Sequence, residues 1–276
     1  MTRGVLLVNL GTPASPAVGD VRAYLGEFLN DPYVIDLPAP LRQIVVSGFI
    51  LPFRPRKSAA AYQKIWDAAG PGTGSPLLHF TQKLGSAVQR RVKDMPCEIA
   101  MRYGQPSIRQ GLQKLAASNA REILLIALYP QHADSTRETT IQALKAQLPE
   151  TMELEVAAPF FDDDNYLRAQ ANLIRRHLNE PWDHLLLSYH GLPERHLIKA
   201  DPTNSHCLSS PDCCQVASTA HTTCYRHQVF ETTRRLVAIL NIDPDRYSVS
   251  FQSRLGRLPW LSPYTAETLI QLAERG

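Results

Sequence analysis

The sequence predicts an α/β protein built on parallel sheets, and two features of the chain support this prediction. Short apolar runs alternate with longer segments of helical periodicity, and the clearest runs are 122–129 (EILLIALY) and 184–190 (HLLLSYH). Both runs are apolar almost throughout, which is typical of strands that helices cover on both faces. Strands that alternate with helices form βαβ units, whose right-handed crossovers place helices on both sides of a sheet.

The expected elements run through the whole chain. The first strand, at 4–10, ends at the turn Gly11-Thr12-Pro13, and a glycine-rich loop at 70–76 precedes a helix at 77–92. Further strands are expected at 34–37, 98–103, 122–129, 152–156, 184–190 and 247–251. Further helices are expected at 18–29, 41–51, 59–66, 108–117, 136–148, 166–178, 225–240 and 265–275.

The segment 159–164 (PFFDDD) is the expected boundary between two related halves, because each side of it holds its own alternation of strands and helices. This predicts an N-terminal half at 1–158 and a C-terminal half at 159–276. The last expected helix is followed by Gly276, and a glycine that closes a helix normally leads into another element. We therefore expect the C-terminal half to lack its last strand and helices.

The composition of the chain argues against nucleic acid as a partner and against a membrane-spanning helix. The chain has 29 Lys and Arg against 26 Asp and Glu, and a net charge of +3 gives no reason to expect nucleic acid. No window reaches the roughly 18 apolar residues of a membrane-spanning helix. The N-terminus runs directly into a strand and lacks the regions of a signal peptide. We expect a cytoplasmic protein, in which the apolar, proline-flanked segment 44–53 allows a peripheral membrane contact.

His190 is the strongest candidate for chemistry. It ends an apolar strand, where the ligands of open α/β sheets bind, and Gly191 lets the backbone turn immediately afterwards. A neutral imidazole at that position can ligate a metal or accept a proton near neutral pH. The alternative is a structural histidine held by hydrogen bonds.

Four of the five cysteines fall within 18 residues, and they are Cys207, Cys213, Cys214 and Cys224. In a reducing compartment such clustering favours a metal site over disulfides. Thiolates hold zinc or an iron–sulfur cluster, and the spacing matches no standard zinc finger. The alternative is a set of free thiols in a loop.

A short basic group and two glycine-rich turns are weaker candidates for ligand binding. Arg54 and Arg56 lie in a short basic group among prolines, which is either a solvated loop or a site for a ligand that carries carboxylates. The glycine-rich turns at 11–13 and 70–76 lack the residues of a phosphate loop and of a dinucleotide-binding fingerprint, so we expect ordinary turns.

The chain also carries a series of motifs in a specific order. They are LLVNLGTP (6–13), VRAYLGEFLNDP (21–32), AAYQKIW (60–66), GSPL (74–77), MRYGQPSI (101–108), LYPQ (128–131), SYHGLPERH (188–196), FQSRLGRLPWLSP (251–263) and the ending AERG. Taken together they resemble the ferrochelatases, which insert ferrous iron into a porphyrin to make haem. The resemblance implies two Rossmann-like halves that flank a porphyrin cleft, with protoporphyrin IX or coproporphyrin III as the substrate and a monomer or homodimer as the assembly.

The resemblance also implies roles for individual residues. His190 matches the active-site histidine, which acts as a ligand of the Fe²⁺ substrate or as a base for pyrrole protons. The positions that match porphyrin-contacting or cleft-lining residues are Asn9, Leu10, Arg54, Arg56, Tyr62, Ser75, Arg102, Tyr103 and Trp260. The family's second catalytic group, a glutamate opposite the histidine, lies beyond the point that corresponds to Gly276. Some bacterial members carry a [2Fe–2S] cluster on cysteines after the His-Gly-Leu-Pro motif, and Cys207, Cys213, Cys214 and Cys224 look like that version.

Two alternatives to this function come from different classes. The first is a chelatase of the same architecture that inserts cobalt or iron into another tetrapyrrole, such as sirohydrochlorin. The second is a porphyrin-binding or metal-sensing protein without turnover, which the absent glutamate would favour.

Overall fold

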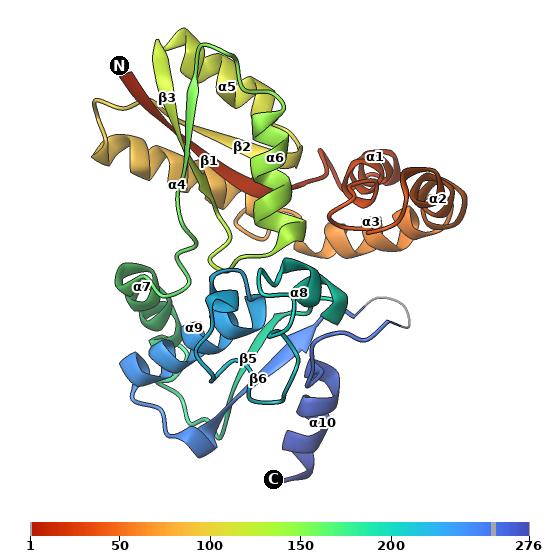
Figure 1. Cartoon of the computed structure of the whole chain (residues 1–276), viewed down its shortest axis with the longest axis vertical. Helices are drawn as coiled ribbons and strands as arrows, with labels where there is room; N and C mark the ends of the chain where they lie inside the picture. Colours follow the sequence, from red (N-terminus) through yellow and green to blue (C-terminus); the bar gives the residue numbers. More distant parts are fainter. Residues whose placement is uncertain (1, 255–257, 276) are drawn as a thin grey trace. The chain divides into compact units, whose positions relative to one another are not determined.

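The computed structural model describes residues 2–254 and 258–275, and the chain divides into two compact units (Figure 1). Unit 1 holds residues up to 129 together with 135–158. Unit 2 holds 130–134 together with the residues from 159 onward. The short segment 130–134 thus groups with unit 2 although unit 1 surrounds it in the sequence, and no sequence pattern indicates this exchange.

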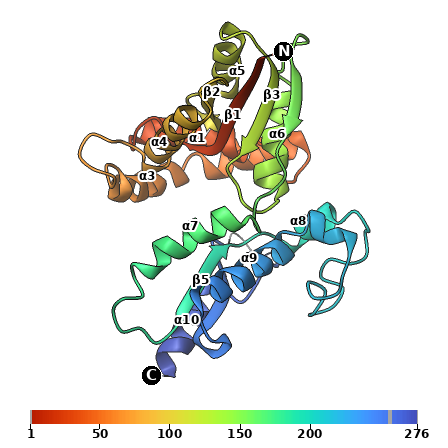
Figure 2. The same ribbon diagram turned by 90° about the vertical axis from the view of Figure 1, so that its left-hand side faces the viewer.

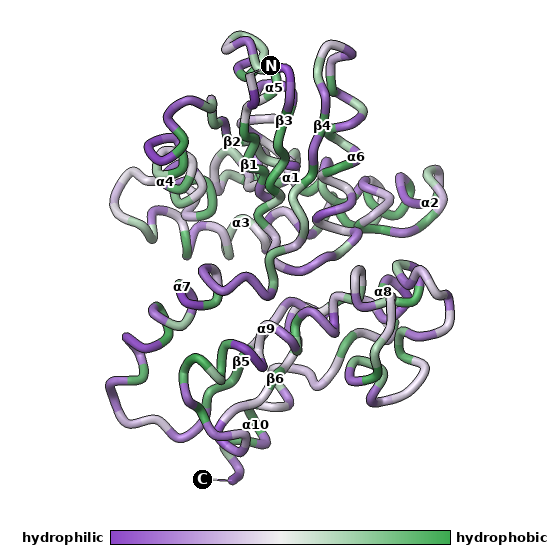
Figure 3. The backbone as a smooth tube through the Cα atoms, turned by 60° about the vertical axis from the view of Figure 1, so that its left-hand side comes forward, coloured by the Kyte–Doolittle hydropathy of each residue, from purple (hydrophilic) through white to green (hydrophobic). Residues whose placement is uncertain are grey.

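Unit 1 is built on a four-stranded sheet in which every strand is parallel to its neighbours. The strand order is β2–β1–β3–β4, and the strands are β1 (Thr2–Thr12), β2 (Cys97–Gly104), β3 (Ala120–Ala127) and β4 (Glu153–Val156). Figure 3 shows a hydrophobic stretch within β1 and another within β3. The parallel sheet and its helices confirm the predicted α/β fold class.

Helices cover both faces of this sheet (Figure 2). Leu6 and Ala100 point toward α5 (Ile108–Ala117) and α6 (Thr139–Lys145), with which they form one core. Neighbouring strand residues point to the other face, where α4 (Pro76–Arg91) packs. This packing is so close that a Cβ on Gly85 of α4 would lie 2.5 Å from Cγ2 of Ile99.

The residues between β1 and α4 form a helical group of their own. It consists of α1 (Val18–Leu29), α2 (Ala39–Ile44), a π-helical stretch (Val45–Ile50) and α3 (Arg54–Ile65). Buried side chains of α1, the π-helical stretch and α3, including Val21, Val46 and Ala59, pack together with Tyr103 of β2. This shared core attaches the helical group to the carboxyl end of the sheet.

Unit 2 contains a two-stranded parallel sheet, formed by β5 (Leu185–His190) and β6 (Tyr247–Gln252). The helices α7 (Asp164–Arg175) and α9 (Tyr225–Leu240) pack on the face that carries Leu187. The opposite face carries Ser188 and Ser250, and both hydroxyls bond to Thr265 of α10 (Thr265–Glu274), at 2.8 and 2.9 Å. Strand residues therefore alternate between two helical layers, as in unit 1.

Three local predictions in the helical group differ from the structure. The strand predicted at 34–37 is wrong, because the amides of Val34 and Ile35 both donate to the Asp31 carbonyl at 3.0 Å and fold this segment into turns. The helix predicted at 59–66 begins five residues earlier, at Arg54, because Pro55 suits the first turn of a helix. The predicted helix at 41–51 is divided between α2 and the π-helical stretch.

The sequence reading missed the shorter helical elements. They are α8 (Glu194–Ala200) and the 3-10 turns Thr219–Thr222 and Pro244–Arg246, while the helix predicted at 136–148 is divided between the π-helical turn Asp134–Glu138 and α6. Elements of three to seven residues are too short to show a clear helical periodicity.

Candidate functional site

His190 is the last residue of β5, and its side chain is exposed at the carboxyl end of that strand. The ring Nδ1 lies 2.7 Å from the carbonyl oxygen of Gly191. A carbonyl oxygen can only accept a hydrogen bond, so this contact favours the tautomer with the proton on Nδ1. The lone pair of Nε2 is then free to bind a metal ion or to accept a proton.

The peptide group that joins His190 to Gly191 is held at both of its polar ends. The Gly191 amide donates to the carbonyl oxygen of Gln252 at 2.7 Å, and the Tyr225 hydroxyl donates to the carbonyl oxygen of His190 at 2.9 Å. A Cβ at residue 191 would lie 2.9 Å from the Gln252 carbonyl oxygen, so this close approach of two backbones favours glycine. Sequence reasoning found His190 and Gly191 but missed Tyr225.

Trp260 lies beside the same turn of unit 2. It forms an isolated antiparallel bridge with Pro193, and the Leu261 amide donates to the Leu192 carbonyl at 3.0 Å. Its Cε3 atom lies 3.5 Å from the position of a Cβ on Gly191. The structure thus brings Trp260 close to the backbone that carries His190. Residues 255–257 of the same motif lie outside the described residues.

In unit 1, Asn9 and Leu10 lie near the carboxyl end of β1 and are ordered by side-chain bonds. The Asn9 amide donates to Thr81 Oγ1 at 3.0 Å, and its Oδ1 accepts from the Leu10 amide at 2.8 Å. Gly11 follows with a φ of +115°, and a Cβ there would lie 1.8 Å from the Tyr103 carbonyl oxygen. Glycine is therefore required where β1 meets the end of β2.

Arg102 and Tyr103, near the end of β2, belong to a buried polar cluster around Asp31. The Asp31 carboxylate accepts from the Arg102 guanidinium, from the Tyr103 hydroxyl at 2.8 Å and from the Thr139 hydroxyl at 2.5 Å. Arg102 Nε also donates to Thr139 Oγ1 at 2.9 Å. Burial, and then the Asp31 charge, raises the pKa of Tyr103, so its hydroxyl stays protonated and donates.

Arg102 and Tyr103 have different roles in this cluster. The Tyr103 ring is fully buried, whereas the Arg102 guanidinium retains some exposure and lies over that ring at 4.3 Å from its centroid. Arg102 is therefore the member that can meet a ligand. Sequence reasoning missed Asp31, although it stands within the motif 21–32.

The other predicted residues of unit 1 lie in and after the helical group. Tyr62 packs edge-on against Tyr24 at 6.3 Å between ring centroids, and burial raises the pKa of its hydroxyl. Ser75 is buried at the start of α4. Arg54 and Arg56 are exposed in the first turn of α3.

The four clustered cysteines of unit 2 are free thiols whose side chains influence one another. A hydrogen bond from Cys214, opposed by burial and supported by the His227 amide and by Cys207, lowers the pKa of Cys224. Burial, and then the charge of Cys224, raises the pKa of Cys207. The bond to Cys224, together with burial, raises the pKa of Cys214. Of Cys207, Cys214 and Cys224, Cys224 is therefore the thiol that ionises most readily.

Basic side chains surround these thiols. Arg226 Nη1 lies 3.6 Å from Cys213 Sγ and 3.7 Å from Cys214 Sγ, so one guanidinium serves both sulfurs. His206 Nε2 lies 2.7 Å from the Cys213 carbonyl oxygen, and His227 Nδ1 lies 2.9 Å from that of Cys214. Within residues 2–254 and 258–275, no group of three or more His, Cys, Asp or Glu side chains is arranged to hold a single metal ion.

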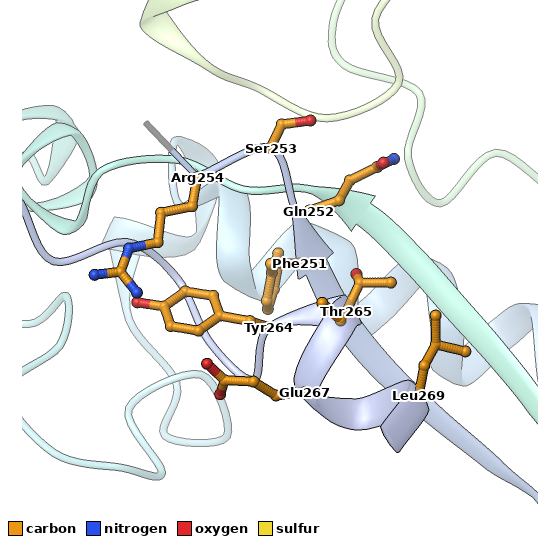
Figure 4. A pocket seen from close by; sticks show the side chains of 9 residues that line it. Phe251, Gln252, Ser253, Arg254, Tyr264, Thr265, Glu267 and Leu269 are labelled. Carbon is orange, nitrogen blue, oxygen red and sulfur yellow. The ribbon is translucent and has the colours of Figure 1, made fainter. Parts of the chain in front are cut away.

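A separate hollow of about 460 Å³ lies at the carboxyl end of β6 (Figure 4). The Arg254 guanidinium carbon lies 4.9 Å from the centroid of the Tyr264 ring, and Glu267 of α10 lines the same hollow. The remaining lining is mixed, with apolar Phe251 and Leu269 beside polar Gln252 and Thr265, and His190 does not contribute to it.

The comparisons with known proteins agree on one family. A family model described as ferrochelatase matches residues 2–276. The chain belongs to the ferrochelatase family. Curated ferrochelatases of Azotobacter vinelandii, Stutzerimonas stutzeri and Pseudomonas fluorescens are 50%, 48% and 48% identical to it, over 99% of this chain and 80% of each relative.

Membership of the ferrochelatases establishes the reaction, which is the insertion of ferrous iron into a porphyrin to form haem. The protein is a ferro-lyase whose substrates are a porphyrin and Fe²⁺. This favours ferrochelatase over the two alternatives from the sequence, a chelatase for another tetrapyrrole and a binding protein without turnover. None of the described helices is long and apolar enough to cross a membrane.

Proposed function

We propose that His190 carries the metal-insertion chemistry through Nε2. The observation that supports this role is the contact of Nδ1 with the Gly191 carbonyl oxygen at 2.7 Å, which leaves Nε2 unprotonated in the neutral ring. Two pyrrole protons must leave as the divalent metal enters, and a free imidazole lone pair can accept a proton or hold Fe²⁺ transiently. Strain in a bent macrocycle would be offset by binding energy from the rest of the porphyrin.

The substitution His190→Ala tests this role. We expect iron insertion to fall by about 10²–10⁴-fold, the range that general-base catalysis supplies. His177→Ala, which changes an exposed histidine of the same unit, is the matched control and should retain activity. Iron insertion by His190→Ala at the rate of the unchanged chain would refute the assignment.

The porphyrin-contacting residues follow the resemblance. We assign this role to Asn9, Leu10, Tyr62, Ser75, Arg102 and Trp260, with Arg54 and Arg56 facing the propionates. The buried Tyr103 ring packs beneath Arg102 and acts through it. The exposed guanidinium groups of Arg54 and Arg56 support their part, since guanidinium binds carboxylate well. Protoporphyrin IX and coproporphyrin III are both candidate substrates, and initial rates of iron insertion into each will distinguish them.

We also propose that Cys207, Cys213, Cys214 and Cys224 hold a [2Fe–2S] cluster. The chemistry of the donors supports this proposal, because the four thiols are free and Arg226 donates to two of the sulfurs, which would stabilise thiolate charge. A cluster of this kind supplies a one-electron centre and links distant parts of the loop.

Chemical analysis of the purified chain tests the cluster. We expect stoichiometric iron and acid-labile sulfide with visible charge-transfer absorption, and we expect Cys224→Ser to lose them. Cys97→Ser is the control that should retain both, because Cys97 lies in unit 1. Zinc without sulfide would contradict the proposal.

The proposed location is the cytoplasm, with a peripheral membrane contact and a monomer or homodimer as the working form. Ile44, Phe49 and Phe53 are strongly exposed apolar side chains, which supports contact between the segment 44–53 and a lipid surface. Flotation of the chain with lipid vesicles, compared with Phe49→Ser, tests the contact. Light scattering gives the assembly.

A further inference from the structure

Tyr225 connects two features of unit 2 that the sequence treats separately. It is the first residue of α9, and it comes directly after Cys224, the N-cap of that helix. Its hydroxyl donates to the His190 carbonyl oxygen at 2.9 Å, across 35 positions of sequence. A carbonyl oxygen can only accept a hydrogen bond, so the Tyr225 hydroxyl is the donor here.

This bond acts on the orientation of the His190 ring. It fixes the carbonyl of the His190–Gly191 peptide, and the amide of the same peptide donates to Gln252. The next carbonyl, that of Gly191, is the acceptor for Nδ1 of the ring. A tilt of the first peptide moves the second carbonyl and weakens its contact with Nδ1. Gly191 has no side chain to resist such a tilt.

The other end of the connection lies among the cysteines. Cys224 caps α9 through its sulfur, which accepts from the His227 amide at 3.5 Å. Cys224 is also buried in one core with Cys207 and Leu192. Movement of the Cys224 sulfur therefore shifts the first turn of α9, and Tyr225 is the first residue of that turn.

We infer that Tyr225 is the positioning residue through which the cysteine segment, residues 201–224, holds His190 in its working orientation. The inference rests on the proposed role of His190 and gives the cysteines a function in iron insertion. A group bound by the thiols would fix the N-cap of α9 and thereby the acceptor of the His190 ring. Tyr225 acts on His190 through its backbone carbonyl.

The first experiment compares Tyr225→Phe with Tyr189→Phe. Tyr189 is the matched control, because its hydroxyl also bonds to α9, at 2.9 Å from Thr233 Oγ1, but not to His190. We expect Tyr225→Phe to lower kcat by about two- to tenfold, the factor that one hydrogen bond is worth, with little change in the KM for porphyrin. Tyr189→Phe should leave kcat close to its original value.

Nuclear magnetic resonance supplies a readout that does not depend on turnover. In chain labelled with ¹⁵N-histidine, the His190 signals are assigned by their loss in His190→Ala. We expect these signals to indicate a ring protonated at Nδ1 in the unchanged chain and a mixture of tautomers in Tyr225→Phe. Unchanged ring signals in Tyr225→Phe would overturn the inference. Full activity of His190→Ala would instead refute the proposed role of His190.

A double-mutant cycle tests the connection to the cysteines. We expect Cys224→Ala, which removes the cap, to alter the His190 ring signals as Tyr225→Phe does. The double variant should then show no further change, because both substitutions break the same path. Additive effects on the ring signals, or no effect of Cys224→Ala, would show that the cysteine segment does not act through Tyr225.

Discussion

At the scale of single residues, a buried carboxylate decides how Arg102 is presented. Asp31 is 5% exposed, and its carboxylate accepts bonds from Arg102, Tyr103 and Thr139. The Thr139 hydroxyl oxygen also accepts a hydrogen bond from Arg102 Nε. The guanidinium is thus fixed along one edge, and its remaining N–H groups stay available to bind a ligand. A guanidinium held in this way loses little freedom when it binds a carboxylate.

Asp31→Asn tests how much the bonds to the Asp31 carboxylate stabilise the protein. We expect a loss of about 3 kcal/mol in the free energy of unfolding, because the largely buried Arg102 charge loses its partner. Glu98→Gln is the matched control: its bond to Lys114 is exposed, and we expect a loss of less than about 1 kcal/mol. Urea unfolding measures both. Equal losses in the two variants would mean that burial of the Asp31 pair has no special importance.

At the scale of elements, the distance between α4 and the sheet depends on Gly85. A Cβ there would lie 2.5 Å from Cγ2 of Ile99, and a β-branched side chain has little freedom to move away. Gly26 of α1 is a helical glycine with space around it, since its nearest contact would be Leu51 Cδ1 at 3.6 Å. Replacing each glycine with alanine should therefore change the stability of the protein in opposite directions.

We expect Gly85→Ala to destabilise the protein by about 1–3 kcal/mol through overpacking against the sheet. Gly26→Ala should stabilise it by up to about 1 kcal/mol, since alanine has the higher helix propensity. Thermal unfolding of the two variants makes the comparison. An increase in melting temperature for Gly85→Ala would show that the sheet and α4 can move apart at little cost.

Local patterns predicted the elements well where a helix or strand is long and clearly delimited. The helices at 108–117 and 225–240 have the predicted bounds, and the first of them begins at a capping box formed by Ser107 and Gln110. The error at 34–37 has a physical cause. Val34 and Ile35 are apolar because they pack against the core of the helical group, and an apolar run alone does not reveal which element it belongs to.

At the scale of the whole molecule, the sequence motifs located His190 and the cysteines but not the bonds that support them. Thr139 and Asp31 are 108 positions apart, and Tyr225 and His190 are 35 apart. Such pairs arise only when strands and helices assemble, so periodicity and local spacing carry no signal for them. The assignment of segment 130–134 to unit 2 has the same origin, since the buried Gln228 side chain accepts from the His132 amide at 2.6 Å.

We expect the cores of the two units to respond separately to changes at the cysteines, because each core is formed by residues of one unit. Leu6, Leu125 and Leu144 pack within unit 1, whereas Cys207 and Cys224 pack within unit 2. If the thiols hold a metal group, its removal by chelator and reductant should increase hydrogen exchange in peptides from 192–229. Peptides from β1 and β3 should keep their protection, since buried sheet amides exchange only through larger openings.

Cys224→Ser should show the faster exchange without any treatment, and Cys97→Ser should not. Equal increases in both units would mean that the thiol site stabilises the whole chain, and no increase at 192–229 would mean that it stabilises neither unit.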